Sequence, residues 1–146
     1  MNDILVEISK EFNDFEKHHK NLYNIEFHVF CGIVYMTFLI LSLKEYKYEL
    51  FVIYSALIYR TFETPFLTYP VLLIMIEYFS RVNDYTKSLN SLYCFIIFFV
   101  FYFGPELSHI LTNEKTVLNM NNITPFTAFI NVFYLLPFSM KCLFGS

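Results

Sequence analysis

The stretch FHVFCGIVYMTFLILSL, residues 27–43, contains no formally charged side chain. A helix that crosses the hydrocarbon core of a bilayer needs about 20 mostly apolar residues, with roughly 17 as the lower limit. A second stretch, SLNSLYCFIIFFVFYFG at residues 88–104, meets the same condition. The two stretches predict membrane-spanning helices, and with them an all-α, polytopic membrane helix bundle.

The composition of the chain agrees with a membrane location. Hydrophobic residues make up 56% and charged residues 16% of the sequence, against roughly 45–50% and 25% in ordinary globular proteins. A net charge of −3, without a basic cluster, argues against nucleic acid as a partner, because phosphate binding needs Lys and Arg in numbers. The length of 146 residues indicates a single integral membrane domain, residues 1–146. Three scattered cysteines without a CxxC pair indicate reduced thiols: Cys31, Cys94 and Cys142.

Two further apolar segments lie between these spans, at residues 50–59 and 65–76. If they formed one long helix, Arg60 and Glu63 would lie within the bilayer, at a cost of roughly 2.5–3.5 kcal/mol for each charge. The residue before Pro65 is also pushed away from helical geometry. We therefore predict two short spans joined by a tight turn at residues 60–65, which makes about four spans in total.

The two ends of the chain are expected to lie at or near the membrane surface. Residues 1–20 predict an amphipathic helix, because apolar residues recur at steps of three and four: Ile4, Leu5, Ile8, Phe12 and Phe15. Gly104-Pro105 predicts the end of the last span and the start of a new helix that carries His109. Residues 117–143 begin polar and end apolar, which predicts a surface segment followed by a fifth helix, apolar or re-entrant, that is interrupted at Pro137.

The four histidines are unevenly distributed. Three of them, His18, His19 and His28, fall within HHKNLYNIEFH at residues 18–28, and His109 follows another apolar run. An even number of spans between the two groups would place all four on the same side of the membrane. On an unbroken helix, nine residues turn the chain through about 900°, so His19 and His28 would face opposite ways. A shared site therefore needs a break in the helix, which Asn21 and Asn24 are suited to provide.

The residue types suit a metal. Neutral imidazole is the commonest metal ligand, and an Fe(II) oxygenase typically uses two histidines and one carboxylate. The candidates are His18 or His19, His28 and His109, with Glu114, Glu106 or Glu26 as the acid. The alternative is a non-enzymatic membrane protein, structural or scaffolding, in which the histidines are interfacial anchors. The absence of HExxH excludes a zincin, and four histidines are too few for the clusters of membrane desaturases.

Three elements follow one another in a recognisable order. His19-x-Asn21-x(6)-His28 leads into the first span, Gly104 precedes His109 with Glu114 five residues on, and Leu136-Pro137-Phe138 lies in the last apolar segment. This order resembles the small endoplasmic-reticulum membrane proteins that include the Fe(II)-dependent 2-hydroxy fatty acid dioxygenases of α-oxidation. The chain departs from the family where Lys115-Thr116-Val117 follows the acid and where Leu22 replaces a common proline.

The resemblance implies an iron-dependent dioxygenase that shortens 2-hydroxy fatty acids by one carbon at the surface of the endoplasmic-reticulum membrane. The cofactor would be Fe(2+), with His18, His19, His28 and His109 as the candidate ligands. Glu114 would be the catalytic carboxylate, either a ligand or an orienter of a ligand. Three protein ligands on octahedral iron would leave three positions, for the hydroxyl and carboxylate of the substrate and for O₂. Membrane lipid, the 2-hydroxy fatty acid and O₂ are the implied partners.

Overall fold

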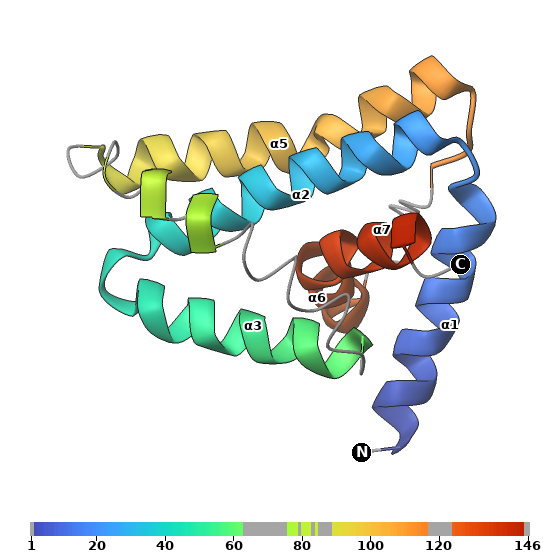
Figure 1. The fold of residues 1–146 in the computed structure, drawn as a ribbon, viewed down its shortest axis with the longest axis horizontal. Helices are drawn as coiled ribbons and strands as arrows, with labels where there is room; N and C mark the ends of the chain where they lie inside the picture. Colours follow the sequence, from blue (N-terminus) through green and yellow to red (C-terminus); the bar gives the residue numbers. More distant parts are fainter. Residues whose placement is uncertain are drawn as a thin grey trace. The chain divides into compact units, whose positions relative to one another are not determined.

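The computed structural model describes residues 2–62, 76–78, 80–82, 84, 89–116 and 124–144 (Figure 1). All regular structure within these ranges is helical, and they contain no strand. The predicted all-α class is confirmed. The chain forms two compact units, one made of Met1–Val29 with Gly104–Ser146 and the other of Phe30–Phe103.

The first unit is built from both ends of the chain. It contains α1 (Asn2–His18), the start of α2 (Leu22–Ser42), the end of α5 (Ser91–Thr112), α6 (Pro125–Phe133) and α7 (Leu135–Phe144). Figure 1 shows α1, in blue, beside α7, in red, although more than a hundred residues separate them in the sequence.

The apolar face of α1 forms the core of this unit. Phe15 is buried together with three residues of the C-terminal segment, and Ile8 and Phe12 pack against the same cluster. The three partners of Phe15 are Ile130, Tyr134 and Phe138. Burying one such side chain stabilises the fold by about 1.5–3 kcal/mol. The predicted N-terminal helix is therefore confirmed, and its apolar face is covered at least in part by protein, while its contact with a membrane surface stays a prediction.

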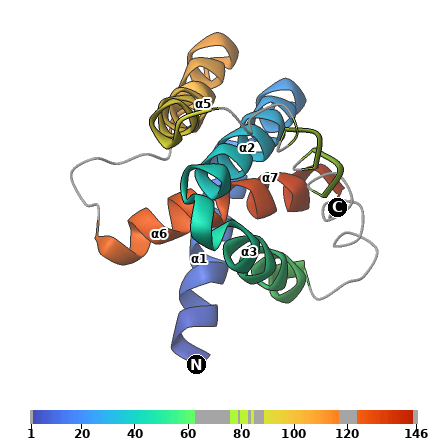
Figure 2. The same cartoon turned by 90° about the vertical axis from the view of Figure 1, so that its left-hand side faces the viewer.

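The C-terminal segment is bent, but not where the sequence suggested. α6 and α7 meet at Tyr134 with a bend of 52° (Figure 2). The predicted interruption at Pro137 is wrong, because Pro137 lies in the first turn of α7. A proline is tolerated there, since the first N–H groups of a helix have no partner within it. At the other end, Thr124 and Thr127 form a capping box that begins α6 at Pro125.

The second unit contains the rest of α2 and α5 together with η1 (Lys44–Tyr46) and α3 (Lys47–Phe62). Aromatic rings join α2 to α5. The ring of Phe30 lies 6.0 Å from that of Phe101, and the ring of Tyr35 lies 6.0 Å from that of Phe98. Because the later residue of α2 meets the earlier residue of α5, the two helices are antiparallel.

Two of the described helices are long and apolar enough to cross a membrane, Leu22–Ser42 and Ser91–Thr112. The bent pair α6 and α7 raises this number to three if the pair is one span. The two uncharged apolar stretches at residues 27–43 and 88–104 thus lie mainly in helices that are candidate spans, and a total of four spans is not confirmed. The predicted turn at residues 60–65 is wrong at its start, because α3 continues to Phe62. Residues 63–75, which include most of the other predicted short span, lie outside the described residues.

α5 does not end at Gly104-Pro105, so the predicted start of a new helix there is wrong. The helix is continuous from Ser91 to Thr112 with Pro105 inside it. A proline within a helix removes one hydrogen bond and costs about 3 kcal/mol. The turn that follows is held in place by contacts of Ser108 and His109 with α2, which offset this cost. His109 therefore lies near the C-terminal end of α5 and not in the first turns of a new helix.

The end of α5 is fixed by a left-handed residue. Asn113 has φ 57°, and the N–H of Glu114 donates to the carbonyl of His109 at 3.0 Å. This is the hydrogen bond of a Schellman motif, in which Gly or Asn follows the helix. The motif turns the chain back on itself and directs Glu114 towards the start of α2, where it accepts hydrogen bonds.

Asn113→Gly is expected to leave the stability of the protein unchanged or slightly higher, because glycine adopts positive φ without a steric penalty. Asn113→Ala is expected to lower the free energy of unfolding by about 1 kcal/mol, since alanine has no side chain that favours the left-handed region. Thermal unfolding of both variants in the same detergent checks this. Equal losses for the two substitutions would contradict the role assigned to the left-handed conformation.

Candidate metal centre

Three histidines meet inside the first unit. His19 lies between α1 and α2, His28 lies on α2, and His109 lies near the end of α5. Their side chains are nearly inaccessible, with exposed fractions of 3%, 2% and 4% respectively. The Nε2 atom of His19 lies 3.3 Å from Nε2 of His28 and 3.1 Å from Nε2 of His109. The ring nitrogens of the three side chains lie within 4.8 Å of one another and could hold a metal ion.

A break in the helix brings His19 and His28 together, as predicted. Asn21 caps α2: its Oδ1 accepts from the N–H of Tyr23 at 2.9 Å, and its carbonyl accepts from the N–H of Ile25 at 3.1 Å. The prediction that Asn24 also contributes to the break is wrong. Asn24 lies inside α2, and its buried amide contacts residues of α5 and the turn after it.

The spacing of the three nitrogens fits coordination to one ion. With N–metal bonds of about 2.1 Å, separations of 3.1 and 3.3 Å correspond to N–metal–N angles of about 95° and 104°. These values lie between the octahedral and tetrahedral angles. Imidazole ligands suit Fe, Zn, Cu and Ni alike, so the donor set fits a divalent transition metal without selecting which one.

The second ring nitrogen of a ligating histidine usually donates to a fixed acceptor, which sets its tautomer. His19 has such a partner, since its Nδ1 lies 2.7 Å from the carbonyl oxygen of Phe15. A carbonyl only accepts, so Nδ1 of His19 carries the proton and Nε2 has a free lone pair. The ring of Phe15 also stacks on that of His19 at 3.7 Å. For His28, no described residue is hydrogen-bonded to Nδ1.

Glu114 connects the end of α5 to the start of α2. Its Oε1 accepts from the backbone N–H groups of Lys20 and Asn21 at 2.7 and 2.8 Å. Its Oε2 accepts from Nδ2 of Asn24 at 2.5 Å, and the same Nδ2 lies 3.3 Å from Nδ1 of His109. Of the two roles predicted for Glu114, these contacts favour the orienter, since both oxygens are engaged away from the Nε2 atoms.

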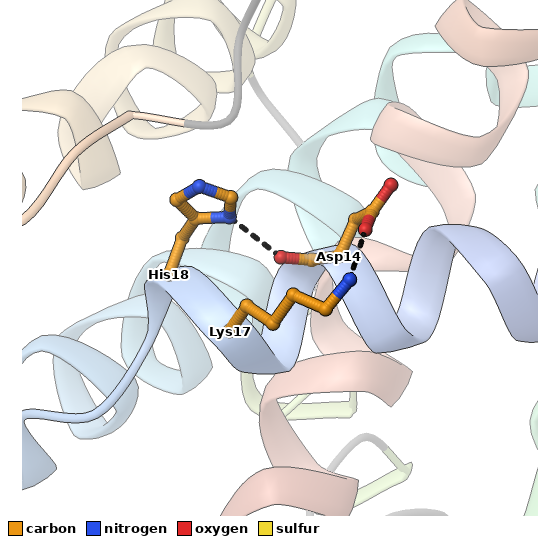
Figure 3. A network of polar contacts seen from close by, with 3 residues as sticks. All are labelled: Asp14, Lys17 and His18. Carbon is orange, nitrogen blue, oxygen red and sulfur yellow. Dashed lines mark hydrogen bonds and ion pairs between the residues drawn. The ribbon is translucent and has the colours of Figure 1, made fainter.

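The remaining candidates lie outside the cluster. Nδ1 of His18 lies 2.7 Å from the carbonyl oxygen of Asp14, whose carboxylate pairs with Lys17 at 3.0 Å (Figure 3). Within the described residues, the group that could hold a metal does not include His18, Glu26 or Glu106. The predicted part of His18 as a further ligand stays a prediction.

Sequence reasoning missed the part that Ser108 and Asn24 play at this site. Ser108 is buried, and its hydroxyl donates to Oδ1 of Asn24 and also lies 2.7 Å from the carbonyl of Pro105. Asn24 and His28 are four residues apart on α2, a spacing that places both on one face of the helix. That spacing, together with the position of Ser108 directly before His109, is the sequence pattern that could have placed Asn24 and Ser108 at the site.

The electrostatics of the site favour a neutral His19 and an ionised Glu114. Burial lowers the pKa of His19 from its usual value to about 4, against a smaller opposite effect of the hydrogen bond to Phe15. Burial alone would raise the pKa of the Glu114 carboxyl. Hydrogen bonds from Asn24, Lys20 and Asn21 together have the larger, opposite effect, so this pKa lies below its usual range. A neutral imidazole is the form that binds a metal.

The stability of the protein is expected to fall as the pH decreases from about 6.5 to about 4. Because the folded pKa of His19 is about 4, against 6.5 in the unfolded chain, the unfolded state binds more protons in this range. Stability therefore rises with pH there, by up to about 3 kcal/mol. Thermal unfolding from pH 7 to 4 measures the effect. His19→Asn, which keeps an N–H near Phe15 but does not titrate, should show a flatter profile, and identical profiles would contradict the assignment.

The fold and the site define an all-α protein of membrane type with a buried three-histidine centre. No family model, curated protein or solved structure matches the chain.

Proposed function

We propose that this chain is a membrane enzyme that binds Fe(2+) at His19, His28 and His109 and shortens 2-hydroxy fatty acids by one carbon. The observation that carries the proposal is the convergence of three Nε2 atoms inside the protein. The order of the histidines, Asn21 and Glu114 along the chain, which resembles the endoplasmic-reticulum dioxygenases, selects the reaction and suggests that membrane as its location.

Burial distinguishes this proposal from a set of interfacial histidines. Anchors at a membrane surface would keep one ring nitrogen in contact with water or lipid headgroups. The exposed fractions of His19, His28 and His109 are at most 4%, and three imidazoles at this spacing are costly to bury unless each finds a partner. A bound cation would supply the partner that all three share.

The surroundings suit a lipid substrate. The end of α5 exposes Leu107, Ile110 and Leu111 on the side of the helix away from the buried His109, an apolar surface that suits contact with the bilayer. On another side of the cluster, Phe15 packs on the rings of His19 and Phe138 and keeps water from them.

The overall reaction needs no further co-substrate. A 2-hydroxy acid and O₂ yield the acid one carbon shorter, carbon dioxide and water, so the substrate loses four electrons and O₂ accepts four. The iron, when bound, would supply a redox-active template for the two reactants. The part of this chain is to hold three neutral imidazoles in place, and the hydrogen bond from His19 Nδ1 to the carbonyl of Phe15 does so for one of them.

One observation favours a structural part for the histidines. The Nε2 atoms of His19 and His109 lie 3.1 Å apart, which is also the distance of a hydrogen bond between two imidazoles. Such a bond would tie α5 to the turn before α2 without a metal. The chain would then be a non-enzymatic membrane protein with a buried polar cluster.

Turnover separates the two functions. Protein purified anaerobically in detergent is loaded with Fe(II) and given a 2-hydroxy fatty acid and O₂, and mass spectrometry searches for the chain one carbon shorter. We expect product from the wild type and none from His109→Ala or from protein without iron. Absence of product from folded, iron-loaded protein across several chain lengths would favour the non-enzymatic membrane protein.

A further inference from the structure

Asn24 is the polar residue of the site whose buried amide joins three different groups. Its Nδ2 donates to Oε2 of Glu114 at 2.5 Å, and its Oδ1 accepts from the hydroxyl of Ser108. The same Nδ2 lies 3.3 Å from Nδ1 of His109. The exposed fraction of Asn24 is 0%, so water does not compete for these contacts.

The two outer partners determine which way the amide is turned. An ionised carboxylate only accepts hydrogen bonds, so the nitrogen of Asn24, and not its oxygen, must face Glu114. The reverse orientation would bring Oδ1 against a carboxylate oxygen. The hydroxyl of Ser108, which lies against Oδ1, is compatible with this orientation because a hydroxyl can donate as well as accept.

The orientation of the amide in turn determines the tautomer of His109. An amide nitrogen is a donor only, so Nδ1 of His109 must accept from Asn24. A neutral imidazole carries one proton, which therefore lies on Nε2. That atom faces Nε2 of His19 at 3.1 Å, whose lone pair is free because its Nδ1 donates to the carbonyl of Phe15. The chain of donors and acceptors is consistent from Glu114 to Phe15.

We propose that Asn24 is a positioning residue that, held by Glu114 and Ser108, keeps the ring proton of His109 on Nε2. The inference deepens the proposed function and rests on it for its consequence. A metal ligand needs a lone pair on Nε2, so His109 must give up this tautomer before it can bind. His19 already has its lone pair free, and His109 is then the ligand whose availability Asn24 controls.

Exchanging the amide and the acid reverses the tautomer while the charge stays the same. In Asn24→Asp combined with Glu114→Gln, the new carboxylate at position 24 accepts from Nδ1–H of His109, from Ser108 and from the new amide at position 114. The oxygen of that amide can still accept from the N–H groups of Lys20 and Asn21. His109 then has a carboxylate behind it and a free lone pair on Nε2, the arrangement common at metal-ligating histidines.

The test measures the two ring nitrogens of His109 by ¹⁵N NMR in metal-free, detergent-solubilised protein. The resonance is assigned by its loss in His109→Gln. We expect the proton on Nε2 in the wild type and on Nδ1 in the exchanged variant. A wild-type protein with the proton on Nδ1 would overturn the proposal, and that result needs no variant to fold. An exchanged variant that folds and keeps the wild-type tautomer would overturn it as well.

Titration with Co²⁺ alone, followed by its visible absorption, tests the consequence for the metal. Changing the group that is hydrogen-bonded to the second ring nitrogen of a ligating histidine typically changes metal affinity by about 10- to 100-fold. The exchanged variant should therefore bind Co²⁺ more tightly by about that factor. Equal affinity would overturn the claim that Asn24 limits binding. If neither protein binds Co²⁺ while NMR shows the expected tautomers, the proposed function fails and the positioning role of Asn24 stands.

Discussion

Replacing any one of His19, His28 and His109 by Ala is expected to weaken the binding of a divalent metal by more than about 100-fold. Removing a residue that is hydrogen-bonded to a metal ligand typically lowers metal affinity by about 10- to 100-fold. Removing a ligand itself should lower it by more. The three imidazoles lie close enough to bind one ion together. After one of them is removed, the other two provide only two of the three ligands. Metal content after dialysis and Co²⁺ titration of the three variants measure the loss.

His18→Ala is the matched control for these substitutions. His18 is adjacent to His19 in the sequence, but its Nδ1 lies 2.7 Å from the carbonyl oxygen of Asp14 and it is not part of the cluster. Metal affinity in this variant should stay within about twofold of the wild type. A loss as large as that of His19→Ala would place His18 among the ligands and would contradict the three-histidine centre.

The sequence was sufficient for those features that depend on local composition. Uncharged apolar runs gave both confident spans, and three- and four-residue periodicity gave the helix at α1, because each signal is contained in the segment itself. The sequence predicted a site shared by His28 and His109 only under one topological condition, an even number of spans between them. The antiparallel arrangement of α2 and α5 meets that condition.

The features that local rules missed depend on contacts between distant segments. Gly104-Pro105 has the composition of a helix end, yet α5 continues because Ser108 and His109 are held by Asn24 on α2. Asn24 itself has the composition of a turn, but its buried contacts keep it within α2. In both cases, tertiary hydrogen bonds outweigh a propensity of about 1–3 kcal/mol, and a single sequence does not reveal them.

Glu114→Ala is expected to lower the free energy of unfolding by about 3 kcal/mol. The substitution leaves the N–H groups of Lys20 and Asn21 and the amide of Asn24 without their acceptor. Hydrogen bonds to a charged group contribute about 1.5–3 kcal/mol each, and water can replace part of the loss at Lys20, which is exposed. Thermal or denaturant unfolding in a fixed detergent measures the change.

Two further variants separate this role from a general effect of charge. Glu26→Ala removes an exposed acid from α2 and should change the stability by less than about 0.5 kcal/mol. Glu114→Gln keeps an oxygen for the two backbone N–H groups but turns an N–H towards Asn24, so its loss should lie between those of the other two variants. The order of the three stabilities tests whether the loss comes from these particular hydrogen bonds. A loss of stability in Glu26→Ala as large as that in Glu114→Ala would contradict this role of the Glu114 carboxylate.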